Sequence, residues 1–172
     1  MIDKNAYGKD FILPAMKMLV KDLWEGKNLE WKKKMIRGIY YMGAFGFNSD
    51  TELMSLQARS ANKKSKDHIF VPEFTGFMIA ENPDRFLYDE DLFLRIWNVS
   101  CCIVKVTSAQ NKSLSGYTKG SFIKCGAIDR YKKENIVLYH KKYGIIDTEQ
   151  AIEDFIKPPK EYFELEKKYI KS

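Results

Sequence analysis

Two short stretches of the sequence carry residue types that hydrolytic chemistry uses. The first is Asp67-His68-Ile-Phe-Val-Pro72, in which an acid and a histidine precede a short apolar run that ends in proline. The second, about forty residues later, is Val-Thr-Ser-Ala-Gln-Asn, which ends at Asn111. A histidine has an ordinary pKa of about 6.5, so it can accept a proton at neutral pH. Because carboxylate and amide oxygens suit Mg²⁺ or Mn²⁺, this combination fits a metal-assisted attack of water on a phosphodiester.

The sequence also indicates which elements would hold these residues. Residues 68–71 are typical of a short extended segment, and residues 102–106 are typical of a second strand. Thr107 is a good N-cap for a short helix over residues 108–115. Asn111 is therefore expected in the first turns of a helix that follows the second strand directly.

These two stretches resemble the HNH, or ββα-metal, nuclease family. In that family a strand carries an acidic residue followed by His, and a second strand leads into a short helix with a His or Asn that faces the first strand. The resemblance covers part of residues 60–118. It implies that Asp67 and Asn111 are ligands of a divalent metal, Mg²⁺ or Mn²⁺. It further implies that His68, on the opposite face of its strand from Asp67, is the general base that takes a proton from the attacking water.

Basic residues near these stretches are candidates for binding nucleic acid. Lys63, Lys64 and Lys66 directly precede Asp67, and Lys112 follows Asn111 in the sequence. The whole chain has 29 Lys and Arg against 23 Asp and Glu, a net charge of +6, which permits a polyanionic partner. We expect that partner to be DNA, with RNA as a possible alternative.

Five aromatic residues are further candidates because they could stack on bases. They are Tyr7, Trp31, Tyr40, Tyr41 and Tyr117. We expect all but one or two of them to pack in the core instead.

Plainer interpretations of the same residues remain open. Asp67 could cap a turn, His68 could be a hydrogen-bonded structural histidine, and Asn111 could be an ordinary polar residue of a helix. The chain would then be a non-catalytic protein that binds nucleic acid or modulates a host enzyme.

Residues 38–43, Gly-Ile-Tyr-Tyr-Met-Gly, invite comparison with GIY-YIG nucleases. In that family the two triplets lie on separate strands, so we interpret the abutting triplets here as a tight strand or turn with packed aromatics.

The fold is expected to be α+β, in one domain over residues 1–172. A ββα-type core at residues 60–118 would follow an N-terminal helix at residues 9–25, with Pro14 in its first turn. A β-hairpin at residues 121–140 and a helical tail at residues 148–172 would complete the chain.

Three further segments are expected to connect these elements. Residues 48–58 would form a loop followed by a short helix, because Asn48-Ser49-Asp50-Thr51 resembles an N-cap sequence. Residues 73–81 and 89–100 would form two helices within the candidate core.

Composition excludes several classes of protein. No run of 18 apolar residues occurs, so no membrane-spanning helix is expected. The three cysteines, Cys101, Cys102 and Cys125, are too few for a disulfide framework and form no CxxC pair for zinc. We therefore expect a cytoplasmic protein, in the host cytoplasm if a phage or other mobile element encodes it.

Overall fold

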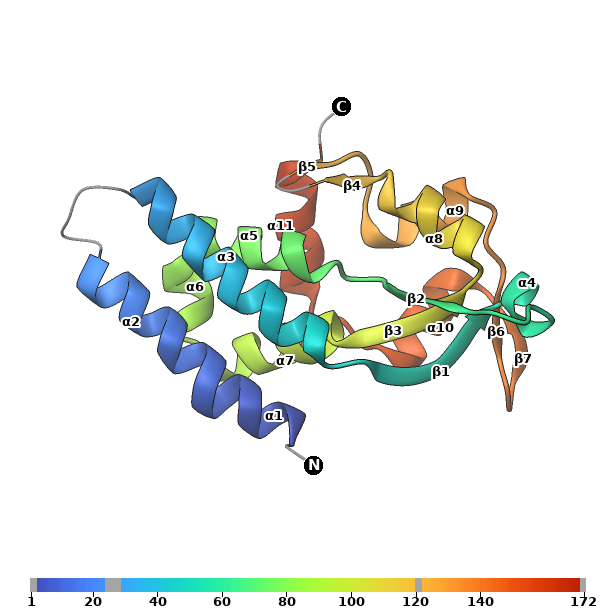
Figure 1. Cartoon of the computed structure of the whole chain (residues 1–172), viewed down its shortest axis with the longest axis horizontal. Helices are drawn as coiled ribbons and strands as arrows, with labels where there is room; N and C mark the ends of the chain where they lie inside the picture. The colour runs from blue at the N-terminus through green and yellow to red at the C-terminus, as the bar shows by residue number, and fades with distance from the viewer. Residues whose placement is uncertain (1–2, 24–28, 120–121, 171–172) are drawn as a thin grey trace.

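The computed structural model of the chain describes residues 3–23, 29–119 and 122–170. Figure 1 shows most of the N-terminal half as helices gathered at one end of the molecule, while the longer strands extend toward the other end. Of the candidate site residues, Asp67 and His68 lie on an edge strand of the sheet at residues 65–68, and Asn111 lies on the helix at residues 108–115.

A five-stranded mixed sheet has the order β2-β3-β1-β6-β7. Its strands are β1 (Ser49–Ser55), β2 (Ser65–His68), β3 (Cys102–Val106), β6 (Leu138–His140) and β7 (Gly144–Ile146). Strands β1 and β3 are parallel, and the other neighbouring pairs are antiparallel. A second sheet contains β4 (Thr118–Lys119) and β5 (Phe122–Ile123). Together with the helices, these sheets confirm the predicted α+β class.

The N-terminal helix is longer than predicted, and Pro14 lies inside it. It comprises α1 (Lys4–Tyr7), a π-helical turn (Gly8–Ile12) and α2 (Leu13–Leu23). Proline has no N–H and clashes with the carbonyl of the residue four positions earlier. That residue, Asp10, lies within the π-helical turn, where the regular hydrogen-bond pattern is already interrupted.

The Gly- and Tyr-rich segment at residues 38–43 is helical, so its interpretation as a strand or turn is wrong. It lies within α3 (Leu29–Gly46), which packs closely against α5 (Pro72–Glu81). Tyr40 is completely buried on one face of α3, and its hydroxyl donates a hydrogen bond to Ser100. Burial of this face stabilises the helix despite the two glycines. Glycine has a weak helix propensity, so the sequence alone favours another structure for this segment.

Two of the helices between β2 and β3, at residues 72–81 and 90–100, are close to the prediction, whereas the short helix at residues 83–87 was not predicted. These helices are α5 (Pro72–Glu81), α6 (Pro83–Leu87) and α7 (Glu90–Ser100). Asp89 caps α7 by accepting a hydrogen bond from the Leu92 amide. Trp97 of α7 is completely buried and meets the ring of Tyr40 edge-on, with ring centroids 5.5 Å apart. These contacts place α3, α5 and α7 in one core next to the sheet.

Two predictions about strands are wrong. Residues 49–55 form β1 in the middle of the sheet rather than a loop, and the short helix α4 (Leu56–Arg59) begins only after it. The predicted hairpin at residues 121–140 contains the helix α9 (Ala127–Lys133) instead, and β6 pairs with β1 and β7. The first error arises because β1 pairs with β3 and β6, which are distant in sequence, so local alternation does not reveal the pairing. In the second, β5 and β6 do not pair with each other but with neighbours just outside the predicted hairpin, β4 and β7.

The remaining helices are close to their predicted bounds. They are α8 (Ser108–Ser115), α10 (Thr148–Phe155) and α11 (Lys160–Tyr169). The C-terminal segment is therefore helical, as predicted. Within the described residues, no helix is both long enough and apolar enough to cross a membrane.

Candidate active site

A cleft of about 300 Å³ lies at the edge strand β2. Asp67 and His68 line it from β2, and Asn111 lines it from α8. Tyr41 and Phe45 contribute a wall from α3. The fold thus brings all three sequence-predicted site residues to one cavity, although they come from segments far apart in the chain.

The pairing of β2 with β3 explains why Asn111 reaches this cleft. Asp67 lies opposite Val104, and β3 then runs directly into α8. Thr107 and Gln110 form a capping box that starts this helix, as the sequence predicts for Thr107. The Ser65 and Ser108 hydroxyls, 3.2 Å apart, connect the start of α8 to β2. These contacts hold α8 against the edge strand.

Asp67 and His68 contact different parts of the molecule. Successive side chains of a strand point to opposite faces. The His68 ring lies 5.5 Å from the Phe45 ring of α3, measured between centroids. Asp67 instead contacts Arg130 and Tyr131 of α9. The imidazole and the carboxylate therefore have different neighbours, although both residues line the cleft.

His68 has an unpaired ring nitrogen inside this cleft. His68 is only 8% exposed, and its Nε2 has no hydrogen-bond partner within the described part of the chain. Burial lowers the pKa of His68 below its ordinary value, while the nearby Asp67 charge and a backbone hydrogen bond with Phe47 raise it. The net lowering favours a neutral imidazole at neutral pH, and Nε2 is then free to accept a proton.

Asp67 is held in a buried ion pair that sequence analysis did not anticipate. Arg130 Nη2 donates to Asp67 Oδ2 at 2.7 Å, and Arg130 Nη1 lies 3.3 Å from Oδ1. The Tyr131 hydroxyl donates to the same Oδ2 at 2.5 Å. Burial, and then the Asp67 charge, raise the pKa of Tyr131, which keeps this hydroxyl protonated. The guanidinium neutralises the carboxylate and fixes its orientation.

Arg130 also holds the backbone beside His68. Its Nη2 donates to the carbonyl oxygens of His68 at 2.5 Å and Ile69 at 3.0 Å. A single buried guanidinium therefore positions both the predicted ligand and the chain that carries the predicted base.

The oxygen atoms at the cleft suit a weakly held divalent ion. The described residues contain no group of three or more His, Cys, Asp or Glu side chains that could hold a metal. Asp67 Oδ1 makes only the longer contact with Arg130, and the Asn111 side chain has no hydrogen bond among the described residues. Mg²⁺ commonly binds through one or two carboxylates together with waters and substrate phosphates. Because Asp67 is paired with Arg130, it offers a cation less charge, so this donor set would hold an ion only together with waters and substrate phosphates.

The four lysines predicted to bind nucleic acid occupy different surfaces. Lys66 lines the cleft. Lys63 and Lys64 are exposed in the turn before β2. Lys112 lines a separate hollow of about 670 Å³ together with Lys124. Of these lysines, Lys66 is the one positioned to meet a phosphate beside His68.

The second histidine of the chain has a different environment. His140 is buried, and its ring stacks on Phe155 with centroids 4.4 Å apart. Its Nδ1 accepts a hydrogen bond from the Lys142 amide, and its Nε2 lies 3.5 Å from Glu52. His140 has structural partners on both nitrogens, so it provides a natural control for His68.

Arg130 and Tyr131 are the site residues that sequence reading missed. They lie in the segment interpreted as a hairpin, where their positions on α9 could not be recognised. One signal was available: a carboxylate next to an apolar strand is expected to be buried, and a buried carboxylate requires a cationic partner. This signal indicates that Asp67 needs a cationic partner but does not identify which residue it is.

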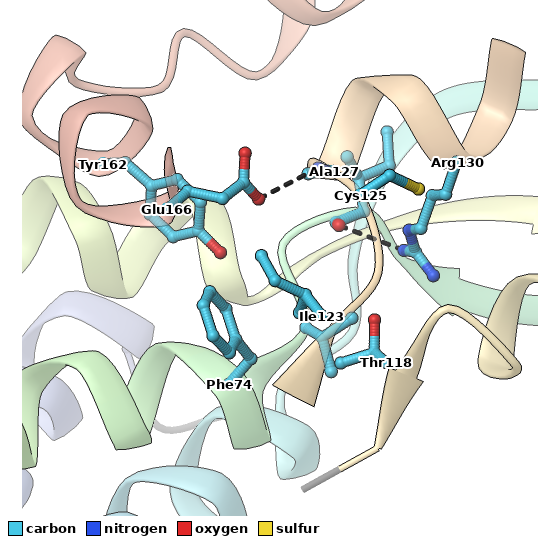
Figure 2. A pocket seen from close by; sticks show the side chains of 10 residues that line it. Phe74, Thr118, Ile123, Cys125, Ala127, Arg130, Tyr162 and Glu166 are labelled. Atoms are coloured by element: carbon cyan, nitrogen blue, oxygen red, sulfur yellow. Dashed lines mark hydrogen bonds between the residues drawn. The ribbon is translucent and has the colours of Figure 1, made fainter. Parts of the chain in front are cut away.

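Figure 2 shows a much smaller cavity, which Arg130 also lines. Its volume of about 10 Å³ has room for about one water molecule. Glu166 of α11 lies here, and it accepts a hydrogen bond from the Ala127 amide at 2.9 Å. Burial raises the pKa of Glu166 to about 7. This cavity is too small for a substrate, so the cleft at β2 remains the candidate active site.

Comparisons with protein-family models, with curated proteins and with solved structures gave no match. The functional argument therefore depends on the residues and geometry of the cleft.

Proposed function

We propose that this protein is a metal-dependent endonuclease of HNH-like type that hydrolyses DNA phosphodiester bonds. The observation that carries the proposal is the meeting of Asp67, His68 and Asn111 at one cleft, with His68 Nε2 buried and unpaired. A buried polar atom without a partner is costly, and a ligand or a catalytic role is one explanation for such an atom in a native structure.

His68 is the general base in this proposal. Because burial lowers its pKa, the imidazole is neutral at pH 7 and accepts a proton at Nε2. The proton comes from the water that forms the new bond to phosphorus, while the leaving oxygen departs with the bonding electrons. The imidazolium must then lose this proton before the next cycle.

Asp67 and Asn111 are the proposed ligands of Mg²⁺ or Mn²⁺. When bound, the ion supplies positive charge against the phosphate oxygens. Arg130 and Tyr131 hold the Asp67 carboxylate in one orientation. Lys66 lies exposed at the cleft and adds a positive charge for the phosphate. DNA is the proposed substrate, RNA is the alternative, and the proposed location is the cytoplasm, that of a host if the gene belongs to a phage.

Plasmid nicking tests the catalytic role of His68. Supercoiled plasmid is incubated with protein and Mg²⁺ or Mn²⁺, with and without EDTA. We expect metal-dependent nicking that falls at least about a hundredfold in His68→Ala, which is the contribution typical of a general base. His140→Gln is the matched control because it changes the other buried histidine, and it should retain nicking once circular dichroism shows that it is folded. Equal rates in His68→Ala and the wild type would contradict the proposal.

Two substitutions at Asn111 test its role as a ligand. Asn111→Ala removes the amide oxygen, so we expect the Mg²⁺ concentration needed for half-maximal nicking to rise. Asn111→Asp keeps an oxygen and adds charge, so it should lower that concentration or leave it unchanged. If both variants show the wild-type metal dependence, Asn111 is not a ligand.

A second candidate function is favoured by the Asp67–Arg130 pair. A carboxylate already neutralised by a buried guanidinium has less net charge to offer a cation. The chain would then bind nucleic acid without cutting it, or modulate a host enzyme. Salt-sensitive DNA binding without metal-dependent nicking would favour this second function.

A further inference from the structure

We propose that the face of α3 beside the cleft binds an unpaired polynucleotide strand, whose bases stack on Tyr41 and Phe45. The inference rests on the proposed nuclease function in one respect: it specifies that the nucleic acid reaching His68 is single-stranded. The binding surface itself is defined by four α3 residues, Lys34, Arg37, Tyr41 and Phe45, and is called the α3 track below.

The aromatic part of the α3 track is accessible. Phe45 is 53% exposed although it is a large apolar side chain. The Tyr41 and Phe45 rings lie 5.3 Å apart between centroids with an angle of 31° between their planes, and both line the cleft. Tyr40 shows the contrast, because it is completely buried on the opposite face of the same helix. Phe45 is exposed and Tyr41 is half-buried, and both rings line the cleft, where they can stack on nucleobases.

The α3 track continues away from the cleft as a second hollow. This hollow has a volume of about 340 Å³ and is lined by Lys34, Arg37, Gly38, Tyr41 and Glu73. Tyr41 and Glu73 also line the cleft, so the two hollows adjoin. Residues 34, 37, 41 and 45 are spaced by three or four positions and therefore share one helix face. At about 1.5 Å per residue the track spans roughly 16 Å, long enough for several stacked or extended groups.

Gly38 keeps this second hollow open. A Cβ added at Gly38 would meet no atom within 4 Å. Glycine in the middle of a helix costs about 1 kcal/mol relative to alanine, and packing gives no reason for it here. The missing side chain leaves the helix surface accessible between Arg37 and Tyr41.

The charges along the track complement phosphate groups. Lys34 and Lys66 are exposed, and neither has an ion-pair partner within the described residues. Arg37 pairs with Glu73, which neutralises the one carboxylate that the two hollows share. A strand could therefore place its phosphates near the two lysines and its bases on the rings.

This combination favours an unpaired strand over a duplex. In a duplex the base faces are covered by their neighbours, so a protein meets mainly phosphates and groove edges. An unpaired strand presents its base faces, which aromatic side chains can cover. The exposed Phe45 ring and the half-buried Tyr41 ring, which both line the cleft, therefore favour the second kind of ligand.

Binding measurements in EDTA test the α3 track without cleavage. Fluorescence anisotropy gives the affinity for a labelled oligothymidine, the matching oligouridine and a DNA duplex of equal length. We expect the wild type to bind one or both single strands at least about tenfold more tightly than the duplex. Phe45→Ala should weaken single-strand binding at least about fivefold, the lower range for loss of one stacked base. Tyr88→Ala is the control, because Tyr88 is 63% exposed and lines neither hollow.

A matched pair of glycine substitutions tests the second hollow. Gly38→Leu should fill it and weaken single-strand binding, while the free space around Gly38 predicts an unchanged fold. Gly46→Leu is the control on the same helix, since its Cβ also meets nothing within 4 Å and it lines neither hollow. Equal binding of duplex and single strands, or unchanged binding in both Phe45→Ala and Gly38→Leu, would overturn the inference.

The outcomes separate this inference from the proposed function. Single-strand binding through the α3 track without metal-dependent nicking would support the track and contradict the nuclease. Nicking that depends on His68, combined with equal affinity for duplex and single strand, would support the nuclease and overturn the track. The two single-strand probes show whether DNA or RNA is preferred.

Discussion

At the scale of single residues, the ion pair between Asp67 and Arg130 has the largest consequence for the site. Both side chains are almost completely buried, and Arg130 also donates to two backbone carbonyls beside the candidate base. A buried ion pair contributes little net stability over an apolar substitute, yet losing one partner is strongly destabilising. The pair therefore acts as a fixed support for β2 and the cleft.

We expect Arg130→Gln to lower the free energy of unfolding by about 3–5 kcal/mol, because it leaves the Asp67 charge buried without its cation. Asp67→Asn in the same background removes that charge and should recover part of the loss. Urea denaturation of the wild type, both single variants and the double variant measures the coupling. Additive effects of the two substitutions would show that the pair is not coupled as its geometry indicates.

At the scale of elements, the order of β2, β3 and α8 determines what meets at the cleft. The capping box between Thr107 and Gln110 starts α8 immediately after β3. The Gln110 side chain also accepts a hydrogen bond from the buried Ser55 hydroxyl, at 2.6 Å. The position of Asn111 therefore depends on a cap that is tied into the sheet.

Removal of this cap should be measurable in both stability and activity. Thr107→Ala is expected to lower the free energy of unfolding by about 1 kcal/mol, because the backbone N–H of Gln110 loses the Thr107 hydroxyl as its acceptor. Thr107→Ser keeps the hydroxyl and should remain close to the wild type. Thermal unfolding compares the two variants, and the nicking assay should show a larger loss for alanine than for serine. If both variants unfold at the same temperature, the cap does not stabilise α8.

At the scale of the whole molecule, the C-terminal helix α11 is joined to the site through a buried acid. Glu166 of α11 accepts from the Ala127 amide at the start of α9, the helix that carries Arg130. Tyr162 of the same helix is buried against Phe70, with ring centroids 4.7 Å apart. The end of the chain therefore supports the segment that follows His68.

This arrangement makes stability depend on pH. Burial raises the pKa of Glu166 from its ordinary value of 4.5 to about 7, so the folded state binds the proton more tightly than the unfolded state. The resulting stabilisation is fully present below pH 4.5 and is lost as the pH rises to about 7. At about 1.4 kcal/mol per pKa unit, the loss is about 3 kcal/mol.

Glu166→Gln should remove this contribution, since glutamine keeps the acceptor but does not ionise. We expect the stability difference between the variant and the wild type to shift in favour of the variant as the pH rises from 4.5 to 7. Urea denaturation of both proteins at several pH values measures this difference in the free energy of unfolding. Glu164→Gln is the control, because the Glu164 side chain is 63% exposed. A constant difference across this range would contradict the raised pKa of Glu166.

Local sequence determined the elements whose signals lie within a few residues. The helix α7, the strand β3 and the Thr107 cap of α8 all occur close to where the sequence predicts them. The same local signals brought Asp67, His68 and Asn111 to attention as residue types suited to one chemistry. Caps and periodicity are short-range properties, so they can be recognised without knowing the fold.

Only the tertiary structure decided what surrounds these residues. The helical state of residues 38–43, the central position of β1 and the placement of Arg130 on α9 all depend on contacts between distant segments. Three contacts of this kind are the burial of Tyr40, the pairing on both sides of β1 and the neutralisation of Asp67. Each stabilises a segment in a structure that the sequence of that segment alone does not predict. The cleft is a product of such contacts, because its walls come from four separate parts of the chain.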